Sequence, residues 1–419
     1  MTAPILLLLL PLLLLLLWSC AVAGAYAFGS IARKWKRMES VAQAQQELPP
    51  LSILLPAHNE AVNLRRHLPE LLRQDYENFE VIVIDQCSTD DTKDVLERLE
   101  LRYAHLRHTF TPQSARDISV ERLAISLGIR SATNEWVVIT RPNCHPLSEG
   151  WLQRIGEIIV HPERSPQSPR LQTPEVLIGL SCYDRQRPSW LKRKITFFRL
   201  WNDILHCNHL LAGHAAVRAD GCNFALRKDV FLRTGGFAQG QNLKAGAIEL
   251  LANQCSTPEN TVLMLSPSSL VVEERQPDVR QWKQERVFDV ETQKHQHHAW
   301  LFRAKKVLQQ TLPLLMLVGF FLPLVAGCVF AAQDQDFVEA WTAPLSQVGL
   351  WLLIVLGLLL YVAYVWVYVR NFCKTAWQLG YETSPAAVFL FSLYLPFWNL
   401  SARLTHWKTD KNEFRKKFV

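Results

Sequence analysis

The chain has 419 residues, and its 45 Lys and Arg against 38 Asp and Glu give a net charge of +7. Its mean hydropathy of +0.02 averages over unlike parts, since long apolar runs flank a body that carries most of the charges. This pattern excludes one uniformly soluble domain. The positive charge needs only anionic membrane lipid as its partner, and no nucleic acid, because basic and aromatic residues are not interleaved. The nine cysteines contain no Cys-x-x-Cys pair, which excludes a zinc framework or a dense disulfide scaffold.

Residues 3–28 form an almost uncharged run that is long enough to cross a bilayer as a helix. Basic residues follow this run, at Arg33, Lys34, Lys36 and Arg37. The positive-inside rule therefore predicts an N-terminal transmembrane helix with the amino terminus outside, followed by a juxtamembrane linker at 29–49. A cleaved signal peptide is the alternative, because Ala21-Val22-Ala23 resembles a processing site, although no Lys or Arg precedes the run.

The charged body, residues 50–300, has the pattern of an α/β domain. Residues 51–55 are apolar except for Ser52, as expected of a strand buried on both faces of a parallel sheet. Further strands at 80–85 and 136–139 are separated by amphipathic helical patterns, which predicts βαβ units. Ligands of such sheets bind beyond the carboxyl ends of the strands, and polar segments follow three of them, at 56–60, 85–88 and 140–143.

The residue strings at these strand ends are specific. Residues 52–60 read Ser-Ile-Leu-Leu-Pro-Ala-His-Asn-Glu, and 81–92 and 135–146 continue the pattern. Together they resemble the nucleotide-binding half of family-2 glycosyltransferases of the GT-A fold, while 221–227 and 235–237 resemble the acceptor half. The resemblance implies a nucleotide-diphospho-sugar transferase domain with a Rossmann-like sheet, with halves at 50–146 and 147–300. The positive-inside rule predicts that this domain faces the cytoplasm. It also implies hexosyl transfer, with inversion, from a nucleotide-sugar to a glycan or lipid-linked acceptor.

The same resemblance implies which residues hold the donor, a UDP-sugar in the first instance. They are Pro56, Ala57, His58, Asn59, Glu60 and Asp85. A carboxylate at a strand end can accept hydrogen bonds from ring N–H or ribose hydroxyl groups. The alternative role for Asp85 is to cap the following helix. Gly221 and Asn223 are expected on the acceptor side.

The chain departs from the family where the family binds Mn²⁺ or Mg²⁺ through Asp-x-Asp, because it has Arg141 and Asn143 there. Hard cations prefer carboxylate oxygens, so no metal and no other cofactor is predicted. Arg141 could contact a phosphate directly, or it could be an ordinary surface arginine on a loop without that role.

Two further motifs are altered. The family's catalytic base falls on Ala247 or Ile248, neither of which can take a proton, so Glu249 or Asp184 are the alternatives. In place of Gln-x-x-Arg-Trp, Gln284 is kept but valine stands in the arginine position, with Arg286 beside it.

In the C-terminal third, two long apolar runs predict transmembrane helices at 308–332 and 346–370. Basic residues flank both runs on the side that the positive-inside rule assigns to the cytoplasm. A shorter apolar stretch at 385–402 favours an interfacial or re-entrant helix, and 403–419 a basic tail. This describes a multi-pass protein of the cell (inner) membrane. His295, His297 and His298 are the alternative metal-binding group, against a basic loop near lipid headgroups.

Two hypotheses for function remain open. The first is a membrane-bound glycosyltransferase, with or without metal. The second is a catalytically inactive relative that binds a nucleotide-sugar and serves as scaffold or regulator for a partner glycosyltransferase or another membrane protein. Loss of metal ligands and base together favours the second, since each is expected to cost orders of magnitude in rate.

Overall fold

The computed structural model describes residues 47–112, 119–162, 173–184, 190–237, 242–274, 278–333 and 344–415, together with Trp18 and Gly24. The N-terminal helix and linker predicted at 3–28 and 29–49 lie almost entirely outside the described residues. The chain divides into two compact units. One holds Arg33–Phe302 with Gln378–Tyr381 and Leu400–Val419, and the other holds the remaining segments.

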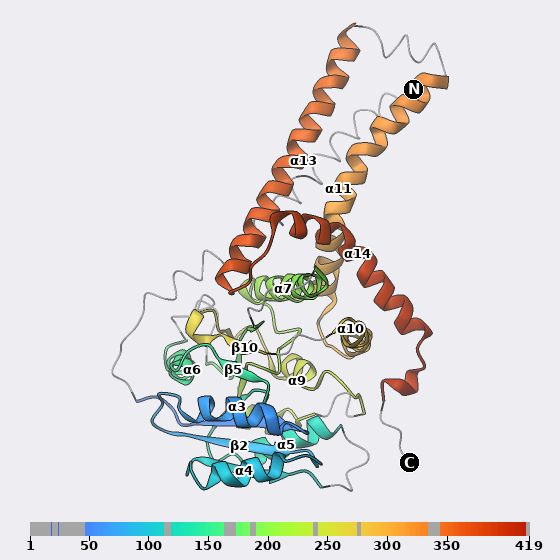
Figure 1. Cartoon of the computed structure of the whole chain (residues 1–419). Helices are drawn as coiled ribbons and strands as arrows, with labels where there is room; N and C mark the ends of the chain where they lie inside the picture. Colours follow the sequence, from blue (N-terminus) through green and yellow to red (C-terminus); the bar gives the residue numbers. More distant parts are fainter. Residues whose placement is uncertain are drawn as a thin grey trace. The chain divides into compact units, whose positions relative to one another are not determined.

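A seven-stranded sheet forms the centre of the first unit, in the order β3-β2-β1-β4-β8-β6-β9 (Figure 1). The first four of these strands along the chain are parallel, whereas β8 runs antiparallel to both of its neighbours. The predicted α/β architecture with a Rossmann-like sheet is therefore confirmed. The strands are β1 (Leu51–Ala57), β2 (Phe79–Asp85), β3 (Leu106–Phe110), β4 (Trp136–Ile139), β6 (Val176–Ile178), β8 (Phe224–Arg227) and β9 (Thr261–Leu263).

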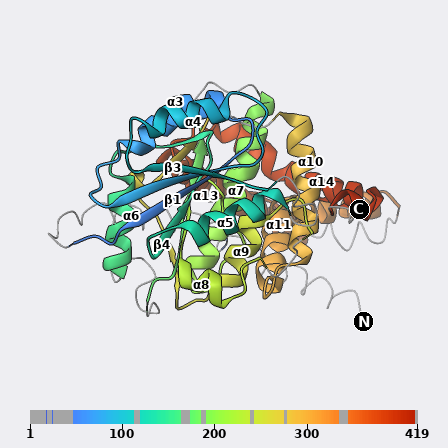
Figure 2. The same cartoon turned by 90° about the horizontal axis from the view of Figure 1, so that it is seen from below.

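Helices cover both faces of this sheet, which is why β1 is apolar without alternation. Ile53 of β1 packs in one buried cluster with side chains of α3 (Ala61–Leu72), α4 (Thr92–Glu100) and α6 (Trp151–Val160). On the opposite face, Gly128 of α5 (Val120–Ser131) lies against Leu54 and Ile84, so closely that a Cβ there would lie 2.8 Å from an Ile84 methyl. Figure 2 shows α3 and α4 on one side of the strands and α5 on the other.

A second, three-stranded sheet lies beyond the end of β4, in the order β5-β10-β7. Its strands are β5 (Cys144–Pro146), β7 (Ser181–Tyr183) and β10 (Val271–Glu273). The remaining helices of this unit are α7 (Trp190–Leu211), α8 (Lys228–Arg233), α9 (Ala247–Cys255) and α10 (Val279–Lys294), with short 3₁₀ turns at Pro267–Ser269 and Lys411–Glu413.

The described part of the predicted basic tail, 403–415, packs against the α/β domain through Phe414. Phe414 is buried, and its ring packs 5.3 Å from that of Phe288 on α10. Its carbonyl accepts a hydrogen bond from the Lys244 backbone, and Leu243 forms an isolated β-bridge with Arg415. One buried aromatic side chain thus anchors a segment that composition alone describes as a solvated tail.

The other unit consists of long helices, and the predicted spans 308–332 and 346–370 fall inside α11 (Trp300–Gln333) and α13 (Pro344–Gln378). The stretch predicted at 385–402 is continuous with α14 (Pro385–Lys408), which extends past Pro396 and beyond the predicted end. Within the described part of the chain, α14 is the helix long and apolar enough to cross a membrane, by length and composition alone. The interfacial or re-entrant interpretation of 385–402 stays a prediction.

Candidate functional site

The loops after β1 and β2 are joined by hydrogen bonds at the carboxyl end of the sheet. Asn59 adopts a left-handed conformation, with φ of 55°, and its side-chain oxygen accepts a 2.8 Å hydrogen bond from the Thr89 backbone. Its own backbone N–H donates to the Ser88 hydroxyl, and His58 Nδ1 lies 2.9 Å from the Gln86 carbonyl. His58 and Asn59 are nevertheless exposed, so two of the predicted donor residues stand side by side on an accessible surface.

Asp85, at the end of β2, stabilises the turn that follows it. Its Oδ1 accepts hydrogen bonds from the backbone N–H and the hydroxyl of Ser88. It does not cap the next helix, because Asp90 accepts from Thr92 at the start of α4. The capping alternative for Asp85 is therefore wrong.

The other predicted donor residues have mixed positions. Pro56 is half-buried and Ala57 is buried at the end of β1. The Glu60 backbone donates to the Thr92 hydroxyl, and its carboxylate accepts a 2.5 Å hydrogen bond from Asn63. Glu60 therefore contributes to the junction between the loop and α3 as well as to the surface.

Arg141 follows β4 and is exposed, with its guanidinium lying against Gly221. A Cβ on Gly221 would approach Arg141 Nη2 to 3.0 Å, so the absence of a side chain makes room for the guanidinium. The antiparallel pairing of β4 with β8 brings the two residues together, and the Thr140 hydroxyl donates to the Cys222 carbonyl. Two residues that the sequence assigned to opposite halves of the domain are thus neighbours.

Asn143 is half-buried at the start of β5 and is already engaged by protein groups. Its side-chain nitrogen lies 3.4 Å from Glu273 Oε1, and its carbonyl accepts from the Glu274 backbone. Arg199 of α7, which the sequence did not single out, pairs with Glu273 Oε2 at 2.6 Å and with Asp220 Oδ2 at 2.5 Å.

These pairings decide whether Mn²⁺ or Mg²⁺ fits at this point. Burial alone would raise the pKa of Asp220, but the guanidinium of Arg199, followed by that of Arg141, holds it below its ordinary value. Asp220 is thus held in its ionised form, and Arg199 already pairs with both Asp220 and Glu273. A hard cation would have to displace Arg199 while approaching Arg141, so the residues present do not fit the family's metal.

Glu249 lies in the first turn of α9 and is half-buried, whereas Ala247 and Ile248 are buried. Its charge acts on Arg218. The helix therefore places Glu249 within the electrostatic reach of an arginine.

Glu285 of α10 is an acidic residue that sequence reasoning missed. It is solvent-accessible, but protein crowds its carboxylate, and this desolvation raises the pKa of Glu285. Glu273 acts in the same direction, and Arg141 opposes it, so Glu285 shares an electrostatic environment with Arg141. The signal was present in the helical spacing, because Gln281 and Glu285 lie four residues apart on the polar face, and Gln281 donates to Glu285 at 3.0 Å.

Gln284 and Arg286, the two residues of the altered Gln-x-x-Arg-Trp motif, lie in different environments. Gln284 is exposed on α10, whereas Arg286 is buried with its guanidinium carbon 4.4 Å from the Phe198 ring centre and 4.8 Å from that of Trp282. Burial lowers the pKa of Arg286 to about 10. The aromatic rings thus hold the cation that was predicted on the diphosphate side.

Asn223, predicted on the acceptor side, is fully buried. Its side-chain nitrogen donates to the carbonyls of Leu180 and Ser269, at 2.9 and 2.7 Å. The structure therefore places Asn223 beneath the site, where it joins the two sheets, and gives it no accessible polar atom for an acceptor.

One group of metal-ligand atoms stands out among the described residues: His67, His145 and Glu274, whose ligand atoms lie within 4.8 Å of one another. No local sequence pattern predicts this group, since the three residues are far apart along the chain. His295, His297 and His298 are not part of any such group in the described ranges.

Comparison with known proteins places the strand-end motifs in a family. The family model described as "Glycosyl transferase family 2" matches residues 52–140, the stretch from β1 to β4. A GalNAc(5)-diNAcBac-PP-undecaprenol beta-1,3-glucosyltransferase of Campylobacter jejuni is 38% identical over 53 residues, 13% of this chain and 17% of the relative. Glycosyltransferase AglE of Haloferax volcanii is 27% identical over 109 residues, 26% of this chain and 34% of AglE. These matches span about a third or less of each relative's own length.

Among solved structures, the mannosyltransferase PcManGT from Pyrobaculum calidifontis, in complex with GDP-Man and Mn²⁺, is 16% identical with a TM-score of 0.47. The match covers 94% of this chain and 100% of the PcManGT chain. The S. aureus TarS 1–349 structure with UDP-GlcNAc is 12% identical with a TM-score of 0.40, over 85% of this chain and 92% of TarS 1–349. Residues 52–140 match the model of glycosyl transferase family 2, and the α/β domain built around them is of the GT-A fold class.

Proposed function

We propose that this protein is a membrane-associated glycosyltransferase that takes a sugar from a nucleotide-sugar donor. The observation that carries the proposal is the pair of joined loops after β1 and β2, which lie within the family match and present accessible polar groups at the carboxyl end of the sheet. The names of the relatives, all of them glycosyltransferases, and the nucleotide-sugars in the similar solved structures support it.

The chemistry of the loops supports one arrangement of the donor. The nucleoside lies over His58 and Asn59 with Asp85 accepting from it, since Asp85 Oδ2 has no hydrogen-bond partner among the described residues. The diphosphate then faces Arg141, whose guanidinium can form paired hydrogen bonds with phosphate oxygens. In this arrangement arginine stabilises the charge of the leaving group, and no step requires a divalent cation. The donor base and the sugar stay open, with UDP-sugar as the first candidate.

Glu285 is the better candidate for the general base. Direct displacement requires the acceptor hydroxyl oxygen to bond to the anomeric carbon while the bond from that carbon to the diphosphate breaks, and the hydroxyl proton must pass to a base. A carboxylate whose pKa is raised, close to the charge of Arg141, suits that role. Glu249 and Asp184 remain the alternatives from the sequence.

The phosphate role of Arg141 can be tested without assuming turnover. We expect UDP to raise the thermal stability of the full-length protein more than uridine does. Arg141→Ala should abolish the difference between the two ligands and leave the uridine effect unchanged, and added Mn²⁺ should not restore it. Arg102→Ala, at an exposed arginine after α4, is the matched control and should behave as wild type. An undiminished response to UDP in Arg141→Ala would exclude the contact.

The base is tested by transfer or hydrolysis of a panel of nucleotide-sugars. Glu285→Gln should lower the rate by about 10²–10⁴-fold while nucleotide binding is kept. Glu249→Gln is the matched substitution and should change the rate only a few-fold. The reverse ranking would move the role to Glu249.

A second function, nucleotide-sugar binding without turnover, is favoured by one specific observation. Arg141 and Asn143 occupy the metal positions, and buried Ala247 and Ile248 occupy the base position. It predicts that nucleotide-sugars stabilise the protein while transfer stays at background, with or without Mn²⁺. A scaffold of this kind should co-purify with another membrane protein from native membranes, and a lone monomer would count against it.

The proposed location is the cell (inner) membrane, in several passes, with the α/β domain in the cytoplasm and the amino terminus outside. The length and hydropathy of α14, and the exposed apolar side chains on α13, such as Leu359 and Trp366, support contact with lipid.

A further inference from the structure

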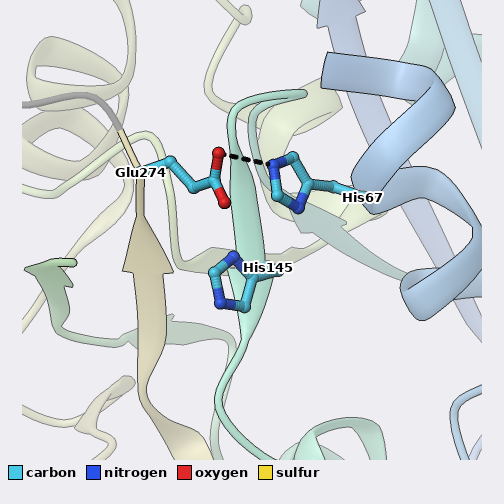
Figure 3. Close-up of side chains that lie close together, drawn as sticks. All are labelled: His67, His145 and Glu274. Carbon is cyan, nitrogen blue, oxygen red and sulfur yellow. Dashed lines mark ion pairs between the residues drawn. The ribbon is translucent and has the colours of Figure 1, made fainter. Parts of the chain in front are cut away.

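Three side chains from separate elements of the α/β domain converge at one point, as Figure 3 shows. His67 comes from α3, His145 from β5, and Glu274 directly follows β10. His67 Nε2 lies 3.1 Å from Glu274 Oε2, and the two imidazole rings stack with centroids 5.1 Å apart and planes inclined by 10°. None of these residues is among those assigned to donor binding or catalysis.

The ring nitrogens at this point lack hydrogen bonds. His67 is 2% exposed, and neither of its nitrogens has a hydrogen-bond partner, because the approach to Glu274 is close but misaligned. His145 Nδ1 is also buried without a partner. Buried polar atoms are nearly always satisfied, and leaving one unpaired costs on the order of 1–3 kcal/mol. One unpartnered nitrogen from each imidazole lies in the same group as the Glu274 carboxylate, which points to a missing cation.

We propose that His67, His145 and Glu274 bind one divalent cation of the zinc type. Two imidazole nitrogens and a carboxylate oxygen are ligands that Zn²⁺ accepts readily, whereas Mg²⁺ and Mn²⁺ prefer oxygen alone. Zinc–ligand bonds of about 2.0–2.2 Å place tetrahedral ligands roughly 3.3 Å apart, close to the 3.1 Å between His67 and Glu274. Rotation of the His145 ring can close the rest, and water completes the coordination.

The carboxylate of Glu274 has an exposed competitor for the cation. Arg66 also pairs with Glu274 Oε2, at 2.9 Å, but its side chain is 67% exposed and free to turn into solvent. Arg66 is therefore a competitor for the carboxylate and not a ligand, which makes its removal informative.

The position of the ion suggests a structural role. Helix α3 begins immediately after the loop of residues 56–60, and β5 begins immediately after Asn143. A cation bound between His67 and His145 would fasten the helix behind the first loop to the strand behind the second. The ion would hold the loop of residues 56–60 and the loop that precedes β5 in fixed positions relative to each other, without contacting a substrate.

The test uses the full-length protein in detergent, purified with an affinity tag that contains no histidine. The protein is stripped with EDTA, dialysed against Zn²⁺, and its zinc content is measured by mass spectrometry. Wild type and Arg66→Gln should retain one zinc per chain after washing. His67→Gln, His145→Gln and Glu274→Gln should lose it. A His297→Gln/His298→Gln variant, which alters exposed histidines outside the group, should keep it.

A second readout guards against misfolding of the variants. Co²⁺ in place of Zn²⁺ should give wild type the intense visible absorption of a four-coordinate site, and Zn²⁺ should displace it and raise the melting temperature. Glu274→Gln, a conservative change at a partly buried residue, should fold and lack both responses. Equal zinc content in wild type and the ligand variants, or a wild type that binds neither metal, would overturn the proposal. Neither readout involves nucleotides or turnover, so the result is independent of the proposed transferase activity.

Discussion

Arginine has an unusual share of the charge at the carboxyl end of this sheet. Arg199 pairs with both Glu273 and Asp220, and Arg141 lies on Gly221 where a divalent cation would be expected in the family. Unlike a bound metal, a guanidinium is part of the chain and cannot be removed by dilution or chelation. At the level of single residues, the positive charge near the strand ends is therefore a fixed property of the fold.

Asn223 provides a prediction at this scale. Asn223→Ala should lower the free energy of unfolding by about 2–5 kcal/mol, because the carbonyls of Leu180 and Ser269 lose their donor and a void remains. Denaturant or thermal unfolding in detergent measures the change. Asn412→Ala, at an exposed asparagine of the same unit, is the control and should stay within about 0.5 kcal/mol of wild type. Equal losses for the two variants would refute the structural role.

Sequence patterns located the strand ends but not all of the side chains that act there. His58, Asn59 and Asp85 were predictable because buried strands of a parallel sheet must end at a common edge. Glu285 was missed because the motif was matched residue by residue, whereas the phase of α10 decides which side chain faces Arg141. The meeting of His67 with His145 depends on tertiary packing, which no local spacing encodes.

Among the secondary-structure elements, β1, β2 and β4 were predicted because each is a run of buried apolar residues. The three-residue strands of the small sheet were not, since a strand of that length has no measurable periodicity.

The start of α9 depends on a glycine. Gly246 has φ of 74°, and a Cβ there would overlap the side chain of Thr292 on α10.

Gly246→Ala is therefore expected to destabilise the domain. The left-handed backbone costs roughly 1–2 kcal/mol for a residue other than glycine, and the overlap with Thr292 adds to it. In the double variant with Thr292→Ala, the overlap is relieved but the backbone strain remains. The two changes should then cost less together than the sum of the single variants, as measured by unfolding in a double-mutant cycle. Strict additivity would show that the two residues do not meet.

The contact of α10 with the C-terminal part of α14 predicts a dependence on pH. Glu291 is buried, which alone would raise its pKa, but hydrogen bonds from Lys294 and His406 lower it from 4.5 to about 2. A carboxyl whose pKa is lower in the folded state stabilises the protein at pH values above its pKa in the unfolded state. This contribution is lost as the pH falls from about 4.5 towards 2.

The measurement compares wild type with Glu291→Gln across that range. The stability difference between the two should be constant near neutral pH and shrink below pH 4.5. A difference that does not change with pH would mean that Glu291 contributes by packing alone.

At the scale of the whole molecule, hydropathy and charge predicted a membrane protein in which an α/β domain interrupts the apolar segments. The two compact units agree with that division, except that residues 400–419 return to the α/β unit. Composition could not reveal the return, because a basic segment with few apolar residues has the same appearance whether or not Phe414 is buried.

Membrane association gives a prediction for the intact chain. The protein should stay in the membrane pellet after an alkaline carbonate wash that releases a cytosolic control protein. A green fluorescent protein fused after Val419 should fluoresce, and alkaline phosphatase at the same point should be inactive, because the basic flanks place this end in the cytoplasm. Active phosphatase would reverse the proposed orientation.

The burial of Phe414 among residues of α10 also bears on synthesis. The ribosome makes this aromatic side chain after every other element of the α/β unit and after the long apolar helices. Until then the α/β unit lacks the part of its core that Phe414 supplies. Nascent chains halted before residue 400 should accordingly be cut by protease in the α9–α10 region, and released full-length chains should resist.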